Sequence, residues 1–238
     1  GMPVFEGYGL TETSPVITVN YFGATMFGTV GAAIQGVEVK IAEDGEILTR
    51  GHNIMKGYYE RPDLTDETID SDGWLHTGDI GELVNGKYLK ITDRKKEIFK
   101  TAGGKYIAPQ MLENKYKESP LIEQIMVLGE NMKFPAALIV PTFPALKNWC
   151  EHKGITYTTN EEMIKNEQVL EKYNKIVVDL GKDFGKWEQV KRFALLAKEF
   201  SIDGGELTPK LSFKRKAILE KNKNTIDKIY KDAENYKG

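Results

Sequence analysis

Two tight-turn signals constrain the fold of the first part of this chain more than any other feature. Asp44-Gly45 and Asn85-Gly86 each separate two short segments in which apolar and polar residues alternate. Such dipeptides accept the positive φ angles of tight hairpin turns, so each pair of segments is predicted to form an antiparallel β-hairpin. The segments are residues 36–41 and 46–50 around the first turn, and residues 81–84 and 88–92 around the second.

The pattern changes after Asp93, where helical and strand-like segments are mixed. Residues 159–162 (TNEE) have the capping residue and the acids of a helix start. Apolar residues then recur at helical spacing and predict one buried face, formed by Met163, Leu170, Tyr173, Val177, Leu180 and Phe184. Further helices are expected at 108–117, 213–222 and 224–231, and strands at 122–128, 136–140 and 192–197. The sequence therefore predicts an α+β fold with a domain boundary near Asp93.

Composition excludes several classes of protein. With 238 residues, 40% apolar and 29% charged, the chain can bury a core and resembles an ordinary globular protein. No apolar run approaches the roughly 20 residues that span a bilayer, and no basic leader opens the chain. The single Cys150 predicts no internal disulfide and a reducing, cytoplasmic compartment. One Cys and three scattered His offer no zinc-ligand spacing.

The charge of the chain is close to balanced overall but uneven along it. A net charge of −2 predicts no general attraction to nucleic acid. Residues 210–231 nevertheless carry eight Lys and Arg against two acids. This run is typical of a solvated helix face, and it is also compatible with a phosphate-binding site. Composition alone does not decide between the two.

Three segments carry candidate chemistry. In residues 7–13 (GYGLTET), glycines beside an aromatic ring let the backbone approach a flat ligand, and Glu12 can hold Mg²⁺. In residues 72–79 (DGWLHTGD), Asp79 can accept hydrogen bonds from a ribose diol. In residues 92–104 (TDRKKEIFKTAGG), the fork of Arg94 can bind phosphate or ribose oxygens. Taken singly, each segment is equally compatible with a turn, a cap or a solvated surface.

Together and in this order, the three segments resemble successive core motifs of the adenylate-forming superfamily. Residues 100–113 (KTAGGKYIAPQMLE) and 205–221 (GELTPKLSFKRKAILEK) are most similar to the long-chain fatty acid–CoA ligases. The resemblance implies that residues 1–92 are the C-terminal, β-barrel-like part of a larger domain. It also implies that residues 93–238 are a small mobile α+β lid domain.

The resemblance also implies a two-step reaction with ATP, Mg²⁺ and coenzyme A. A fatty acid carboxylate attacks the α-phosphorus of ATP to give an acyl-adenylate and pyrophosphate, and the CoA thiol then displaces AMP. The implied roles are adenine stacking for Tyr8, close backbone approach for Gly9, phosphate binding for Thr11, Mg²⁺ binding for Glu12, ribose binding for Asp79 and ribose or phosphate contact for Arg94. Asp93 would be the hinge, and the Gly103-Gly104 turn would enter the site for the CoA step.

Two departures from the family pattern stand out. The phosphate-cradling loop of the family precedes the first of these motifs and is absent here, so we expect this polypeptide alone to be inactive. The family's adenylation lysine lies three residues before an Arg, and counting back from Arg215 gives Ser212. A flexible ammonium can reach a phosphate from a neighbouring position, so we place Lys214 first and Lys210 second as its replacement.

Two other readings stay open: a fatty acyl–AMP ligase that loads a carrier protein, and a degenerate module without catalysis. Fatty acid substrates predict peripheral membrane contact, although the sequence shows no strong amphipathic anchor. Apolar surface in the strand-rich part, if left uncovered, predicts homodimers.

Overall fold

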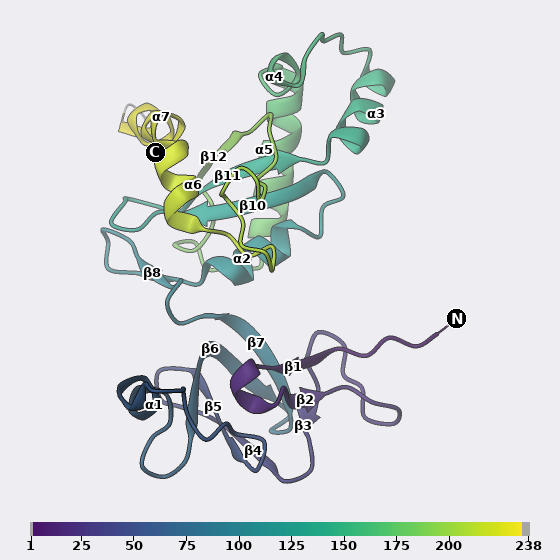
Figure 1. The fold of residues 1–238 in the computed structure, drawn as a ribbon. Coiled ribbons are helices and arrows are strands. Elements are labelled where there is room, and N and C mark those ends of the chain that lie inside the picture. Colours follow the sequence, from purple (N-terminus) through teal and green to yellow (C-terminus); the bar gives the residue numbers. More distant parts are fainter. Residues whose placement is uncertain (1, 235–238) are drawn as a thin grey trace. The chain divides into compact units, whose positions relative to one another are not determined.

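The computed structural model describes residues 2–234 (Figure 1). They form two compact units, divided between Ile98 and Phe99. Asp93 lies in strand β7 (Tyr88–Arg94), inside the first unit. Its role as a hinge, and the domain boundary at residue 93, therefore stay predictions.

The first unit is built on a seven-stranded sheet in which all neighbouring strands pair antiparallel, in the order β1-β2-β3-β7-β6-β5-β4. The other strands are β1 (Gly7–Gly9), β2 (Val16–Val19), β3 (Ala32–Ala33), β4 (Val37–Ile41), β5 (Glu46–Gly51) and β6 (Leu75–Val84). A 3-10 helix, η1 (Thr11–Thr13), follows β1, and α1 (Pro62–Thr68) connects β5 to β6. The predicted strand-rich first part is confirmed.

Both predicted hairpins are present. β4 pairs with β5 across the first turn, where Gly45 has φ 86°, and β6 pairs with β7 across the second. Asn85 and Gly86 have φ 52° and 66°, the left-handed region that these residue types tolerate best. These turns fix the register of β5, β6 and β7, and therefore place the ends of these strands.

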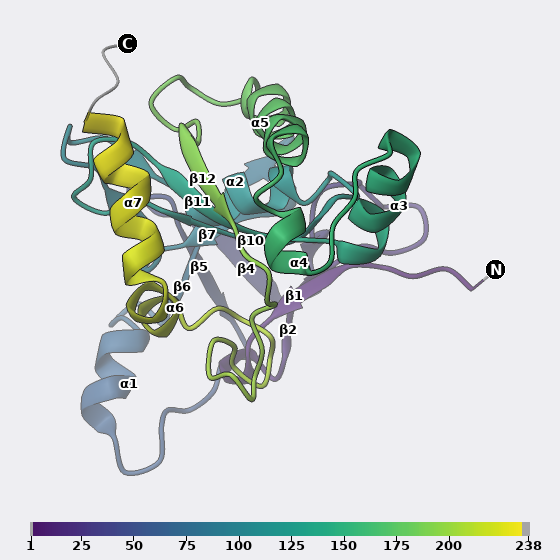
Figure 2. The same ribbon diagram turned by 90° about the horizontal axis from the view of Figure 1, so that it is seen from above.

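The second unit contains a three-stranded sheet with helices on both faces (Figures 1 and 2). β10 (Ile122–Leu128) runs antiparallel to β11 (Ala136–Pro141), which is parallel to β12 (Arg192–Leu195). The helices are α2 (Pro109–Tyr116), α3 (Phe143–Lys153), α4 (Asn160–Met163), α5 (Glu167–Gly181), α6 (Arg215–Lys221) and α7 (Lys223–Glu234). A separate two-stranded ribbon pairs β8 (Phe99–Lys100) with β9 (Tyr106–Ile107).

The sheet of the second unit is apolar on both sides because both sides are covered. Along β10, Ile125 and Val127 face a core shared with α2, α3 and α5. The alternate residues, Met126 and Leu128, face a second core shared with α6 and α7. Successive strand residues point to opposite faces, so a strand covered on both sides must be continuously apolar. The predicted α+β class is confirmed.

The helical prediction after residue 159 is correct at its start and wrong in one detail. Thr159 caps α4 by accepting a hydrogen bond from the backbone N–H of Glu162, but α4 ends at Met163. Asn166 then caps a new helix, α5. The break separates Met163 from the rest of the predicted face. Within α5 the buried row is Val169, Tyr173, Val177 and Gly181, so Leu170, one residue beyond Val169, is 38% exposed.

Helices α1 and α3 were not predicted. α3 begins with a proline in its first turn and ends at Gly154 with φ 67°, two boundary signals that the sequence does contain. Within residues 2–234, every helix is too short or too polar to cross a bilayer.

Candidate functional site

The carboxylate of Asp79 lies at the centre of a polar cluster in the first unit. The Tyr8 hydroxyl donates to its Oδ2 at 2.6 Å, and the Arg94 Nε lies 3.2 Å from its Oδ1. Tyr8 comes from β1, Asp79 from β6 and Arg94 from β7, where Asp79 and Arg94 are direct register partners. The sheet thus joins three predicted ligand-binding residues from segments far apart in the sequence.

In this cluster, Tyr8 and Arg94 are the donors and the Asp79 carboxylate is the acceptor. Burial raises the pKa of Tyr8, and the hydrogen bond to Asp79 and the negative charge of Asp79 raise it further. The phenol is therefore a neutral donor at physiological pH. The Asp79 side chain is only 7% exposed. Its Oδ2 accepts the hydrogen bond of Tyr8 and its Oδ1 forms the ion pair with Arg94, and a carboxylate has about four acceptor positions. Asp79 can therefore still accept hydrogen bonds from two further hydroxyls.

Gly9 is required by the close approach of two chain segments. A Cβ at this position would lie 1.6 Å from the carbonyl oxygen of Pro15, so no side chain fits. The buried Thr13 hydroxyl holds the same turn by donating to the carbonyl of Pro15 at 2.7 Å and accepting from the N–H of Leu10 at 2.9 Å. Residues 9–15 therefore form a tight loop directly after Tyr8.

Glu12 is half-buried in this loop and has one protein partner for its side chain. The Tyr58 hydroxyl donates to Glu12 Oε1 at 2.9 Å, and the N–H of Met55 donates to the Glu12 carbonyl at 2.8 Å. Thr11, beside it, is exposed. Within the described part of the chain, no three His, Cys, Asp or Glu side chains gather as they do in a metal site built from protein ligands alone. Glu12 is thus a single oriented carboxylate.

Sequence reasoning missed Glu46, which contacts both segments that carry the cluster. It is buried at the start of β5 and accepts hydrogen bonds from Gly78, His76 and Lys95. The signal in the sequence was an acid at the start of a predicted strand. The structure shows that this residue and the next three, Glu46 to Thr49, are all buried. Its partners lie 30 to 49 positions away, so no local pattern identifies them.

Gly103 and Gly104 belong to the second unit. They form the exposed turn between β8 and β9, where the N–H of Gly104 donates to the Thr101 carbonyl at 2.9 Å. Gly104 has φ 78°, and a Cβ on Gly103 would meet no atom within 4 Å. The turn needs the left-handed conformation only at Gly104.

Lys210 and Lys214 lie on a second turn of the same unit. The N–H of Leu211 donates to the Thr208 carbonyl at 2.8 Å, and the N–H of Thr208 donates to the Ser212 carbonyl at 2.9 Å. This is a three-residue hairpin loop, and its last residue normally is a glycine in the left-handed region. Here Leu211 takes that place with φ 61° and is 67% exposed. Both lysines are exposed.

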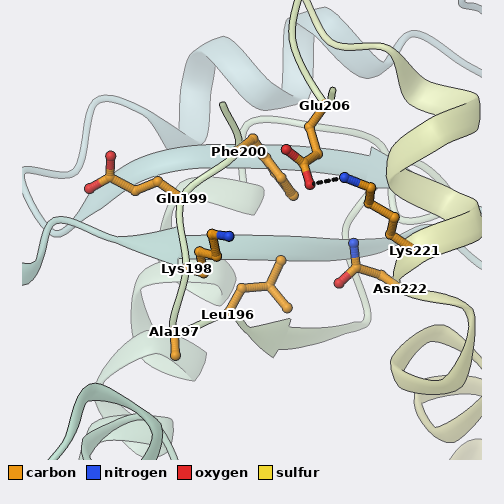
Figure 3. A pocket seen from close by; sticks show the side chains of 8 residues that line it. All are labelled: Leu196, Ala197, Lys198, Glu199, Phe200, Glu206, Lys221 and Asn222. Atoms are coloured by element: carbon orange, nitrogen blue, oxygen red, sulfur yellow. Dashed lines mark hydrogen bonds and ion pairs between the residues drawn. The ribbon is translucent and has the colours of Figure 1, made fainter. Parts of the chain in front are cut away.

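Two ion pairs anchor this turn. Arg215, at the start of α6, forms a bidentate pair with Glu113 at 2.8 and 2.9 Å and donates to the Val127 carbonyl at 3.1 Å. At the end of α6, Lys221 bonds Glu206 at 2.7 Å (Figure 3). Lys221 also donates to the Gly204 carbonyl. Lys221, one of the basic residues between 210 and 231, is therefore engaged in contacts within the unit. The hollow around this pair is lined by Leu196, Ala197, Lys198, Glu199, Phe200, Glu206, Lys221 and Asn222 (Figure 3).

Comparison with known proteins agrees with this architecture. Residues 1–59 match the AMP-binding enzyme family, and residues 96–234 match the AMP-binding enzyme C-terminal domain. The chain is 38% identical over 244 residues to human long-chain-fatty-acid–CoA ligase 6, covering 97% of this chain and 35% of that protein. It is 36% identical to long-chain-fatty-acid–CoA ligase FadD15 of Mycobacterium bovis, covering 97% of this chain and 38% of that protein.

Solved structures show the same fold. The A domain of a Segniliparus rugosus carboxylic acid reductase, in complex with AMP and a carboxylic acid, superimposes with a TM-score of 0.72 at 23% identity. It covers 96% of this chain and 35% of that chain. O-succinylbenzoate coenzyme A synthetase from Bacillus subtilis, in complex with ATP and magnesium, gives 0.60 at 26% identity, covering 83% of this chain and 38% of that chain.

The family matches thus define the class, since two parts of the chain match two domains of one enzyme family. The chain belongs to the AMP-binding enzymes, and the relatives that it resembles at 36–38% identity are long-chain fatty acid–CoA ligases. The predicted resemblance is confirmed. The chain spans just over a third of the length of these relatives.

Proposed function

We propose that this chain provides the ribose-binding cluster and the lid of an ATP-dependent ligase that joins long-chain fatty acids to coenzyme A. The observation that carries the proposal is the Tyr8–Asp79–Arg94 cluster, found in a chain similar throughout to long-chain fatty acid–CoA ligases. The reaction has two steps. The fatty acid carboxylate attacks the α-phosphorus of ATP and releases pyrophosphate, and the CoA thiol then attacks the acyl carbon and releases AMP.

In this proposal the first unit binds the nucleoside. Asp79 accepts hydrogen bonds from the two ribose hydroxyls while Tyr8 and Arg94 hold its carboxylate in place. The ring of Tyr8 lies against adenine, and Gly9 allows the tight loop of residues 9–15 to follow directly beside the nucleotide. Thr11 is exposed on the next turn and donates to the adenylate phosphate. These groups act mainly by positioning and by charge stabilisation.

Glu12 is the residue that would hold Mg²⁺. A protein commonly binds this ion through one or two carboxylates together with substrate phosphates. Glu12 fits that role because, among residues 2–234, Tyr58 bonds one of its oxygens and leaves the other available, and the residue is not fully buried. When bound, the ion would neutralise charge on the phosphates.

The second unit would contribute the residues that change between the two steps. Lys214 is the first candidate for the adenylation lysine, because its backbone N–H is tied to the Glu206 carbonyl at 2.7 Å and Arg215 beside it is anchored. Lys210, at the tip of the exposed turn, is the second. Asp93 is proposed as the hinge, and the Gly103-Gly104 turn as the part that enters the site for the CoA step.

The test is acyl-AMP and acyl-CoA synthesis from palmitate, ATP and CoA. It compares this chain with a protein of the full length of its relatives that contains it. We expect synthesis only from the longer protein. In the cell, we place the reaction at the cytoplasmic face of a membrane, from which the fatty acid is drawn. Acyl-AMP without acyl-CoA, rescued by a carrier protein, would support the carrier-loading alternative. Inactivity of both proteins with a range of carboxylates would support the degenerate module.

A matched pair of variants in the longer protein tests the site itself. Asp79→Ala should reduce acyl-AMP formation by about 100-fold, the scale of losing a charged hydrogen-bond acceptor in a binding site. Asp72→Ala, at an exposed turn position in the same motif, should leave it unchanged. Equal activity of the two variants would remove Asp79 from the site.

A further inference from the structure

We propose that Glu46 is a positioning residue, a buried carboxylate that orients Asp79 and Arg94 through the residues beside them. The inference rests on the proposed function, because it assigns Glu46 a task in the same nucleotide site. Nothing in the motifs at residues 7–13, 72–79 and 92–104 points to Glu46, which lies in none of them.

The contacts of Glu46 reach both segments that supply the cluster. Its Oε1 accepts from the N–H of Gly78 at 3.0 Å, and Gly78 directly precedes Asp79. Its Oε2 accepts from Lys95 Nζ at 2.9 Å, and Lys95 directly follows Arg94. A further hydrogen bond joins the two segments, since the N–H of Lys95 donates to the Gly78 carbonyl at 2.9 Å. Gly78 is thus held at both its N–H and its carbonyl.

The peptide that Glu46 holds is one with conformational freedom. Gly78 has φ 72°, and a Cβ there would meet no atom within 4 Å, so it has no side chain that packs it in place. The carboxylate of Glu46 restrains its peptide through the N–H. Because Asp79 is the next residue, the direction of its side chain depends on how Gly78 is held.

The charge balance around Glu46 explains how a buried carboxylate is tolerated. Its side chain is only 5% exposed, and burial opposes its ionisation. Hydrogen bonds from Lys95, His76 and Gly78 together outweigh burial and hold the pKa of Glu46 below its ordinary value. Lys95 also pairs with Asp44 at 2.6 Å. Burying a charge is costly unless it is paired and hydrogen-bonded, and here all its donors come from the segments next to the site.

A purely structural role for Glu46 makes a different prediction from a positioning role. If Glu46 only stabilised the sheet, its loss would lower the stability of the first unit and affect all ligands equally. If it orients Asp79, its loss would selectively weaken recognition of the ribose diol. The informative quantity is therefore the ratio of the affinities for AMP and for 2′,3′-dideoxy-AMP, which lacks both hydroxyls.

The experiment uses the 238-residue chain, isotope-labelled, with both nucleotides titrated and followed by NMR. Glu46→Gln keeps the shape and an acceptor for Gly78 but removes the charge that holds Lys95. Lys95→Met removes the other partner. The control is Glu38→Gln on the neighbouring strand β4, where Glu38 forms an exposed pair with Arg50. We expect Glu46→Gln to lower the AMP preference by about tenfold, the scale of one hydrogen bond to a charged group. We expect Lys95→Met to lower it less and Glu38→Gln to leave it unchanged.

An unchanged AMP preference in a folded Glu46→Gln variant would overturn the positioning role. If the wild-type chain shows no preference for AMP, the proposed function of this site fails. Glu46 is then judged by the resonances of Gly78, Asp79 and Arg94. Shifts at all three in Glu46→Gln but not in Glu38→Gln would support the orientation of both segments by Glu46. Shifts confined to residues 46–48 would contradict it.

Discussion

The two units hold their candidate site residues in different ways. In the first unit, the functional side chains bond one another directly, as Tyr8 and Arg94 do with the nearly buried carboxylate of Asp79. In the second unit, Lys210 and Lys214 are exposed, and what the structure fixes is the backbone of the turn that carries them. The first arrangement presents a preorganised binding surface. The second presents flexible cations on an anchored frame.

This difference indicates where substitutions should act. In the first unit, changes that disturb the backbone near Tyr8 or the support of Asp79 should alter the binding surface itself. In the second, removing an exposed lysine should cost little stability, and the large effects should come from the buried anchors of the turn.

The largest effect is expected from the buried anchor of the second unit. Arg215→Ala leaves Glu113, whose side chain is 6% exposed, without its bidentate partner. Breaking such a pair typically costs about 3–5 kcal/mol. Urea unfolding of the second unit measures it, with Lys115→Ala as the control, because the partners of Lys115, Glu118 and Asp183, are exposed. A loss for Arg215→Ala no larger than that for Lys115→Ala would show that the turn is anchored otherwise.

A glycine pair compares the two units directly. Gly9→Ala must move the segment at Pro15 and should destabilise the first unit by about 3 kcal/mol, the upper range for overpacking. Gly103→Ala meets no neighbour and should change the stability of the second unit by less than about 0.5 kcal/mol. Thermal unfolding of both variants provides the comparison. Equal shifts in unfolding temperature for the two variants would contradict the close packing of Gly9 against Pro15.

The support of Asp79 should appear in the pH dependence of stability. The folded pKa of Glu46 is lowered, so its contribution is complete above its unfolded pKa of about 4.3 and is lost as the pH falls through the folded value. The pKa of Lys95 is raised by Asp44 and Glu46, so its contribution is lost only as the pH rises above about 10.4. Between these limits the two contributions should be constant.

Glu46→Gln tests that sign. On acidification from pH 6 to 3, the wild type should lose about 1.5 kcal/mol more unfolding free energy than Glu46→Gln, the lower end of the scale for a hydrogen bond to a charged group. Urea unfolding at a series of pH values measures the difference. A steeper loss in the variant than in the wild type would show that Glu46 is destabilising when charged.

The smallest effect concerns Leu211. A non-glycine residue in the left-handed region is strained by roughly 1–2 kcal/mol, and glycine recovers this at some entropic cost. Leu211→Gly should therefore stabilise the second unit by about 0.5 kcal/mol. If stability instead falls, the exposed Leu211 side chain makes a contact that strain alone does not reveal. Thermal unfolding distinguishes the outcomes. Leu219→Gly, on helix α6, is the comparison that should be destabilised.

The structural features that could be predicted from the sequence are those determined by a few neighbouring residues. The turns at Gly45 and Asn85-Gly86 could be predicted because their chemistry is contained in two residues. The apolar strands β10 and β11 could be predicted because burial on both faces leaves a continuous apolar run. Leu170 was misplaced because Val169 and Leu170 both lie at helical spacing from Tyr173, and only the tertiary packing decides that the row of Val169 is the buried one.

The candidate site divides along the same line. Tyr8, Asp79 and Arg94 were identified from motifs, and the structure brings them together. Their supports were not identified. In the sequence, Glu46 resembles any surface acid, and its partners His76, Gly78 and Lys95 become its neighbours only in the folded sheet. The partner of Arg215 lies 102 residues away. Such pairings depend on the tertiary fold, which a single sequence does not display.

An AMP titration of the labelled wild-type chain, followed residue by residue in NMR spectra, tests the nucleotide site. We expect saturable shifts at Tyr8, Gly78, Asp79 and Arg94 in the first unit, with millimolar affinity, and their loss in Asp79→Asn. Shifts confined to the second unit, or an unchanged response in Asp79→Asn, would contradict it.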